Sequence, residues 1–227
     1  MTKLFISGID TDIGKSYACG ALARTLIHAG YQLFTQKIVE TGCESGVSND
    51  LLTHAKMVGH DFNKGLKAQH CPYTFKLPAS PHLAAELENA EINLDYIAEK
   101  MHDLAVQCDH LLIEGAGGLC VPLNGYHMII DFISDNQLPV ILVTSSRLGS
   151  INHTILSLEL CQQRNIEVRS VIYNLYSDSP SEISVSTRST LQLYMQKKHP
   201  DALWLELPKN GHSIDMTESQ MSLLLGI

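Results

Sequence analysis

The sequence predicts an α/β fold with a mostly parallel central sheet and helices on both faces. Apolar, strand-like segments alternate with segments of helical periodicity along the whole chain, and glycine or polar residues follow the strand-like ones. No linker or repeat divides the 227 residues, so we expect a single domain over residues 1–227. The expected strands are 4–7, 33–39, 111–114, 140–144, 168–173 and, more weakly, 202–205, and the expected helices are 15–29, 50–58, 94–107, 151–164 and 182–198.

The first expected strand ends in a loop, GIDTDIGKS (8–16), and the first helical pattern begins inside it. This is the layout of a phosphate-binding loop, in which backbone N–H groups at a helix N-terminus face an anion. Lys15 supplies a mobile positive charge and the Ser16 hydroxyl can ligate Mg²⁺. Five residues separate Gly8 and Gly14 where the common form has four, so a glycine-bounded turn with a chance lysine is the alternative. The flanking strand and helix favour a P-loop NTPase-like domain.

The second and third expected strands end in charged residues, at the sheet edge where α/β folds bind ligands. Lys37 stands among apolar residues, which is unusual for a lysine unless it faces an anion; a structural salt bridge is the alternative. Glu114 ends the third strand, where a carboxylate holds Mg²⁺ directly or through water in nucleotide sites. The glycines within residues 115–118 allow backbone to approach a phosphate or a substrate.

Three further positions are candidates for ligand contacts. Asp50, at the head of a helix, is either a second Mg²⁺ ligand or a helix cap. The loop 144–152 enters a helix at Gly149 and offers free N–H groups to another anion. The Asn174 amide can pair with the edge of an adenine, or can form an Asx turn. Together these positions predict a Mg-nucleotide enzyme with a second anionic ligand.

The composition of the chain argues against several classes of protein function. A net charge of −8, with Lys197-Lys198 as the only local basic run, argues against a nucleic-acid partner. No apolar segment has the length of a membrane span, so we expect no membrane association. The N-terminus lacks a signal-peptide pattern and the six cysteines form no C-x-x-C pair, which predicts a cytoplasmic protein with reduced thiols. The eleven histidines show no metal-ligand spacing and are expected to be surface or core residues.

Residues 59–91 lack long periodicity. A loop of that length in a compact domain is often functional, and a lid over the substrate and an ordinary surface excursion are both open interpretations.

The assembled motifs resemble those of the dethiobiotin synthetase family, ATP-dependent carboxylases that close the ureido ring in biotin synthesis. In order they are G-x-D-T-x-x-G-K-[ST], which includes the five-residue spacing, K-x-V-x-[ST]-G, P-Y-x-F followed by S-P-H, E-G-A-G-G and L-G-x-I-N-H. The resemblance runs from the first strand to at least Asn174 and so covers most of the chain.

The resemblance implies a role for each matching position. Mg²⁺ would be held by Ser16, Asp50 and Glu114, and the catalytic lysines Lys15 and Lys37 would surround the carbamate and the γ-phosphoryl group. ATP, the co-substrate, would be bound by Asp12, Ile13, Gly14, Lys15, Ser16, Tyr17, Asp50, Glu114, Gly115, Ala116, Gly117, Asn174, Leu207 and Pro208, with Lys209 near the adenine. The substrate would be bound by Thr11, Lys37, Thr41, Gly118, Gly149, Ser150, Ile151 and Asn152. The family works as a homodimer, in which the helix N-terminus at 149–152 of one subunit receives the substrate carboxylate bound in the other.

The implied reaction starts from 7,8-diaminononanoate and CO₂, which form a carbamate. ATP phosphorylates the carbamate to a carbamic-phosphoric anhydride, and the second amine closes the ring. Such chemistry needs positioning and charge neutralisation rather than covalent help. Ile9 and Ile38 replace a usual threonine and proline at backbone positions, where we expect small effects. Ser16 and Thr41 stand where the family has threonine and serine, so each position keeps its hydroxyl. The region after Asn174 aligns poorly with the family, and nucleotide preference is therefore the least constrained expectation.

A switch ATPase of the partitioning type is the main rival hypothesis, since its topology is similar. Such proteins usually carry a lysine just before the loop glycines, where this chain has Ser7, and a basic or amphipathic tail, where residues 211–227 are mildly acidic. An amidotransferase-like or phosphotransacetylase-associated ligase domain would normally be fused to more chain. A P-loop domain of unassignable function is the remaining alternative.

Overall fold

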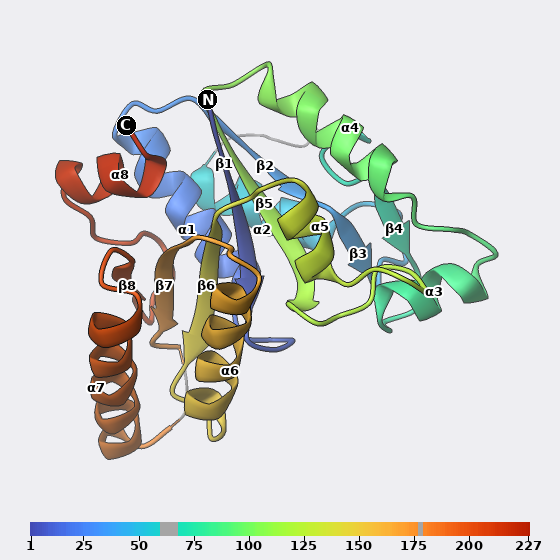
Figure 1. Cartoon of the computed structure of the whole chain (residues 1–227). Coiled ribbons are helices and arrows are strands. Elements are labelled where there is room, and N and C mark those ends of the chain that lie inside the picture. The colour runs from blue at the N-terminus through green and yellow to red at the C-terminus, as the bar shows by residue number, and fades with distance from the viewer. Residues whose placement is uncertain (60–67, 177–178) are drawn as a thin grey trace.

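The central sheet of the molecule has six parallel strands and confirms the predicted α/β fold (Figure 1). The computed structural model describes residues 1–59, 68–176 and 179–227. The strand order is β2-β5-β1-β6-β7-β8. These strands are β1 (Thr2–Gly8), β2 (Leu33–Lys37), β5 (His110–Gly118), β6 (Val140–Ser145), β7 (Val168–Asn174) and β8 (Leu203–Leu207).

Helices cover both faces of the sheet, as Figure 1 shows. Right-handed crossovers between parallel strands place helices on opposite faces when the chain reverses its direction across the sheet, as it does after β2. One face is covered by α1 (Lys15–His28), α2 (Asn49–Val58) and α8 (Glu218–Leu225), and the other by α4 (Leu94–Ala105), α5 (Ile129–Asp135), α6 (Ser150–Gln163) and α7 (Ser181–Lys198).

The three central strands β5, β1 and β6 form the middle of the core. Phe5, Ile6, Ile113 and Leu142 are fully buried, because both faces of a doubly covered parallel sheet are shielded from water. The carboxyl ends of these strands therefore meet on a rigid edge, and the loop after Gly8 lies at its centre.

The expected strand 33–39 is wrong as a single element. It divides into β2, which ends at Lys37, and β3 (Val39–Thr41), which pairs in parallel with β4 (Tyr73–Phe75) in a separate two-stranded sheet. The register shows the cause: Ile6 of β1 faces Glu114, whereas Gly8 faces Gly118, so β5 bulges between them and its backbone leaves β2.

The sequence analysis did not predict several short helices and one short strand. Within 59–91 the chain forms β4 and α3 (Pro81–Leu87), while residues 60–67 lie outside the described part, so the lid hypothesis stays a prediction. The helices α5 and α8 were not predicted either. They span 7 and 8 residues, too few for a helical period to stand out.

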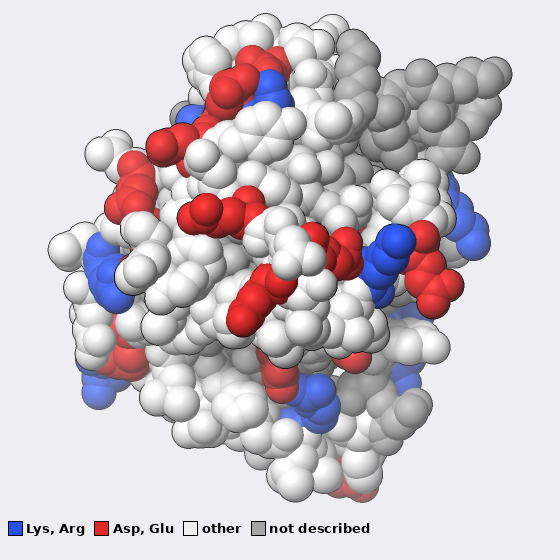
Figure 2. All heavy atoms as spheres, turned by 90° about the vertical axis from the view of Figure 1, so that its right-hand side faces the viewer, with Lys and Arg blue, Asp and Glu red and all other residues white. Residues whose placement is uncertain are grey.

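The surface carries mixed charge. On the face shown in Figure 2, acidic side chains are spread widely and the basic ones stand singly or in small groups. No helix in the described part of the chain is long and apolar enough to cross a bilayer.

Candidate nucleotide and metal site

The loop between β1 and α1 is built to bind an anion. Gly14 occupies the N-cap of α1 in a left-handed conformation (φ 96°), and no side chain caps the helix, so N–H groups of its first turn are free. The Asn174 side chain, at the end of β7, donates from Nδ2 to the Ile13 carbonyl (3.0 Å) and fixes the loop from behind. A β-carbon on Gly14 would lie 2.3 Å from that Nδ2 atom.

Lys15 is buried at the same loop with its Nζ atom 3.0 Å from the Asp10 carbonyl oxygen, to which it donates. Burial, followed by the nearby charge of Lys37, lowers its pKa to about 8. Within the described residues no carboxylate forms an ion pair with Lys15. An arriving phosphate would therefore supply the counter-charge that this ammonium lacks.

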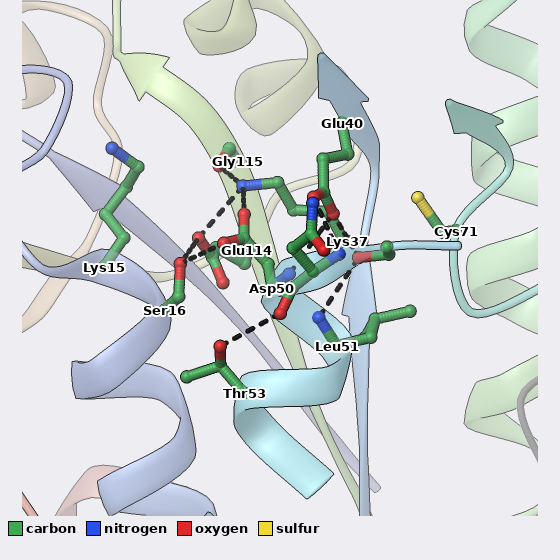
Figure 3. A network of polar contacts seen from close by, with 12 residues as sticks. Lys15, Ser16, Lys37, Glu40, Asp50, Leu51, Thr53, Cys71, Glu114 and Gly115 are labelled. Carbon is green, nitrogen blue, oxygen red and sulfur yellow. Dashed lines mark hydrogen bonds and ion pairs between the residues drawn. The ribbon is translucent and has the colours of Figure 1, made fainter. Parts of the chain in front are cut away.

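Three oxygen-bearing side chains converge beside the loop (Figure 3). Ser16 Oγ lies 2.6 Å from Asp50 Oδ1 and 2.9 Å from Glu114 Oε1. These residues come from α1, α2 and β5, so the sheet edge brings together positions 98 residues apart. A hydroxyl and two carboxylates are hard oxygen donors of the kind that Mg²⁺ prefers, and the predicted metal ligands fit that ion.

Lys37 lies against the same cluster. Its Nζ atom is 2.5 Å from Asp50 Oδ2, 2.9 Å from Glu114 Oε1 and 2.9 Å from the Gly115 carbonyl oxygen. Burial alone would lower the pKa of Lys37, but Glu114 and Asp50 raise it well above its usual value. Burial alone would raise the pKa of Glu114, but Lys37 and His54 hold it well below its usual value. Opposite charges thus favour the ionised form of both groups, and the salt bridge that was one interpretation of Lys37 is present.

The N-terminus of α2 positions Asp50. Ser48, not Asp50, caps this helix: its hydroxyl accepts from the Leu51 N–H (3.1 Å), so the cap interpretation of Asp50 is wrong. Glu40 of β3 accepts from the N–H groups of Asn49 (2.8 Å) and Asp50 (3.4 Å) and from the Ser48 hydroxyl. Burial raises the pKa of Glu40. The sequence analysis missed its role, although a carboxylate in a buried strand was a usable signal.

Replacing Glu40 by alanine is expected to lower the free energy of unfolding by about 1–2 kcal/mol, because a helix N-terminus loses its anion and its acceptor. The affinity for Mg²⁺ should fall as well, since Glu40 also accepts from the N–H group of Asp50, which is a candidate metal ligand. Denaturant melts with and without Mg²⁺ measure both effects, and Glu44→Ala, an exposed site in the next turn, is the control. An unchanged Mg²⁺ affinity would show that Asp50 is positioned without Glu40.

A cavity of about 620 Å³ lies over this cluster. Most predicted positions line it: Thr11, Asp12, Gly14, Lys15, Ser16, Tyr17, Lys37, Thr41, Asp50, Glu114, Ala116, Gly117, Asn174, Leu207, Pro208 and Lys209. The lining residues that were not predicted are Val39, Glu40, Thr53, Tyr176, Asn210 and Gly211.

The remaining predicted positions lie elsewhere. Ile13 and Gly118 are not part of the cavity lining, and Gly115 contributes the carbonyl that Lys37 contacts. The segment Gly149, Ser150, Ile151 and Asn152 begins α6 and is not part of the lining either. Asn174 Oδ1 accepts from the Tyr176 N–H (2.9 Å), so the Asx turn exists, and the adenine contact of this residue stays a prediction.

The phosphate loop at the centre of a parallel sheet, with an acidic cluster beside it, defines a P-loop NTPase. A protein-family model described as "AAA domain" matches residues 2–199. Solved structures show the same fold at 12% identity and a TM-score of 0.52: the signal recognition particle receptor FtsY of Elizabethkingia anophelis (99% of this chain, 63% of that one) and the MinC:MinD complex of Aquifex aeolicus (100% and 86%).

Sequence comparison with curated proteins shows to which family of P-loop NTPases the chain belongs. The chain is 45% identical over 207 residues to the ATP-dependent dethiobiotin synthetase BioD 2 of Haemophilus ducreyi, covering 91% of this chain and 98% of the relative. It is 46% identical over 206 residues to the protein of that name from Pasteurella multocida (90% and 96%). The chain belongs to the ATP-dependent dethiobiotin synthetase family.

Proposed function

We propose that the protein carboxylates 7,8-diaminononanoate in an ATP- and Mg²⁺-dependent reaction and closes the ring to dethiobiotin in the cytoplasm. The observation that carries the proposal is the convergence of Ser16, Asp50, Glu114 and Lys37 beside an open phosphate loop. Family membership supports the substrate, and the geometry supports phosphoryl transfer.

The residues present divide the work. The free N–H groups at the start of α1 and the Lys15 ammonium would bind the ATP phosphates. Ser16, Asp50 and Glu114 would hold Mg²⁺, which when bound neutralises phosphate charge. Lys37 would then leave its carboxylate partners for the carbamate, and Thr41 would donate a hydrogen bond on the diamine side.

The proposed reaction proceeds in three steps and needs no covalent bond between the enzyme and the substrate. One amine bonds to CO₂ and loses a proton, which gives the carbamate. A carbamate oxygen attacks the γ-phosphorus and ADP leaves. The second amine then attacks the carbonyl carbon, phosphate leaves and a proton is lost. Lys15 and Lys37 stabilise the negative charge that develops on the transferring group.

A homodimer would complete the substrate site. The N-terminus of α6 has no side-chain cap and does not line the cavity of its own chain, so its N–H groups can serve a carboxylate held in a second copy. Leu148 and Leu156, beside and on α6, are 92% and 60% exposed, which favours burial against another subunit.

Phosphate release tests the proposal. With MgATP, bicarbonate and 7,8-diaminononanoate, release should require every component, and mass spectrometry should find a product with one added carbonyl. Phosphate release that does not depend on the diamine would overturn the proposal and favour a switch ATPase.

A further inference from the structure

His54 is a buried histidine that the reaction scheme above does not use. It lies on α2, four residues after Asp50, so the two side chains share one face of the helix. Its ring is 1% exposed, and Nε2 lies 2.8 Å from Glu114 Oε2. One helix thus presents a candidate metal ligand and a direct contact to a second one.

The contacts of Glu114 show what this ring does. Oε1 lies 2.9 Å from both Ser16 Oγ and Lys37 Nζ, on the side where Asp50 also lies. Oε2 has the His54 ring as its partner, and the whole side chain is shielded from water. An ionised carboxylate only accepts hydrogen bonds, so Nε2 of His54 must carry the hydrogen.

Packing between α1 and α2 brings the ring to this position. A β-carbon on Gly20 of α1 would lie 2.6 Å from Met57 Sδ and 3.3 Å from His54 Cα. The missing side chain lets α2 approach α1, which carries Ser16. Cys19, also fully buried, lies beside the ring: its sulfur and the ligand atoms of His54 and Glu114 lie within 4.8 Å of one another.

We propose that His54 is a positioning residue for Glu114: its Nε2–H holds Oε2 and so turns Oε1 toward Ser16 and Asp50, where the Mg-nucleotide binds. The inference rests on the metal site of the proposed function. Without the ring, Oε2 would be buried with no donor, and no contact from that side would fix the rotation of the carboxylate. Hydrogen bonds to a metal ligand from outside the metal shell typically change metal affinity by about 10–100-fold.

The test measures metal binding rather than turnover. Mn²⁺ is titrated, with electron paramagnetic resonance as the readout, into the protein and a non-hydrolysable ATP analogue. His54→Leu replaces the ring by an apolar side chain and so removes the donor, and we expect the dissociation constant for Mn²⁺ to rise at least about tenfold. His54→Gln retains an N–H donor and should recover most of the affinity.

His110→Leu is the matched control. His110 is also a buried histidine, 5% exposed, and it begins the strand that carries Glu114, with its ring edge-on to Tyr31. This variant can change thermal stability but should bind Mn²⁺ as the wild type does. The proposal is overturned if His54→Leu keeps wild-type affinity, if His54→Gln loses as much as His54→Leu, or if His110→Leu loses as much.

A second measurement uses the unmodified protein and covers the case in which His54→Leu does not fold. The ring ¹⁵N signals of His54 should shift when Mg²⁺ and the analogue are added, because Glu114 changes its partners. Unmoved signals in a nucleotide-saturated protein contradict the proposal. No diamine is present in either experiment, so a failure to form dethiobiotin would reject the proposed function and leave this inference standing.

Discussion

Replacing Lys37 by alanine is expected to lower turnover by on the order of 10²–10³-fold while the protein still folds. The Lys37 ammonium lies between Asp50, Glu114 and the Gly115 carbonyl, at the point where the metal ligands meet the cavity. No other cation of the described residues contacts both carboxylates. Single-turnover phosphate release with saturating MgATP isolates the chemical step from binding.

The same variant makes a second result measurable. Without Lys37, the carboxylates of Asp50 and Glu114 face each other with less compensating charge, so the melting temperature should fall in EDTA. Mg²⁺ should restore much of the loss, because it would occupy the space between the same oxygens. Lys56→Ala, an exposed lysine on α2, should change neither quantity. Near-normal turnover of Lys37→Ala would remove Lys37 from the mechanism.

The parts of the site that follow strand ends were predictable from sequence. The loop 8–16, Lys37 and Glu114 each stand after an apolar segment, and parallel strands bring their carboxyl ends to one edge. The sequence pattern and the fold rule together were enough to place Lys37 and Glu114 at the same edge of the sheet, and the pairing of β2 with β5 brings them into contact.

Other parts depend on packing between elements, which no local pattern records. His54 reaches Glu114 because Gly20 lets two helices approach, and Glu40 meets the N-terminus of α2 because β3 leaves the main sheet. The break of the strand at Lys37 has its cause in the bulge of β5, on a neighbouring strand. Residues 149–152 lie outside the cavity of their own chain, so the substrate contact expected of them stays a prediction.

Replacing Gly14 by alanine is expected to reduce ATP affinity by at least about tenfold, because the change alters the loop that holds the phosphates. Gly14 has a φ of 96°, and its added β-carbon would meet Asn174 Nδ2 at 2.3 Å. Asn174 also fixes Ile13, so the loop and β7 must move apart. Equilibrium binding of a fluorescent ATP analogue measures the loss.

Gly14→Ala combines backbone strain with a clash against Asn174, and Gly30→Ala is the control that has the backbone strain alone. Gly30 has nearly the same φ, 95°, but nothing lies within 4 Å of its added β-carbon. Both variants should lose roughly 1–2 kcal/mol of folding free energy to the left-handed backbone, and only Gly14→Ala should lose nucleotide affinity. The double variant Gly14→Ala/Asn174→Ala then tests the contact itself. If the clash with Asn174 displaces the loop, the two substitutions must be non-additive, so that the double variant loses less ATP affinity than the sum of the two single losses. Additive losses would instead assign the effect to the backbone conformation of Gly14 alone.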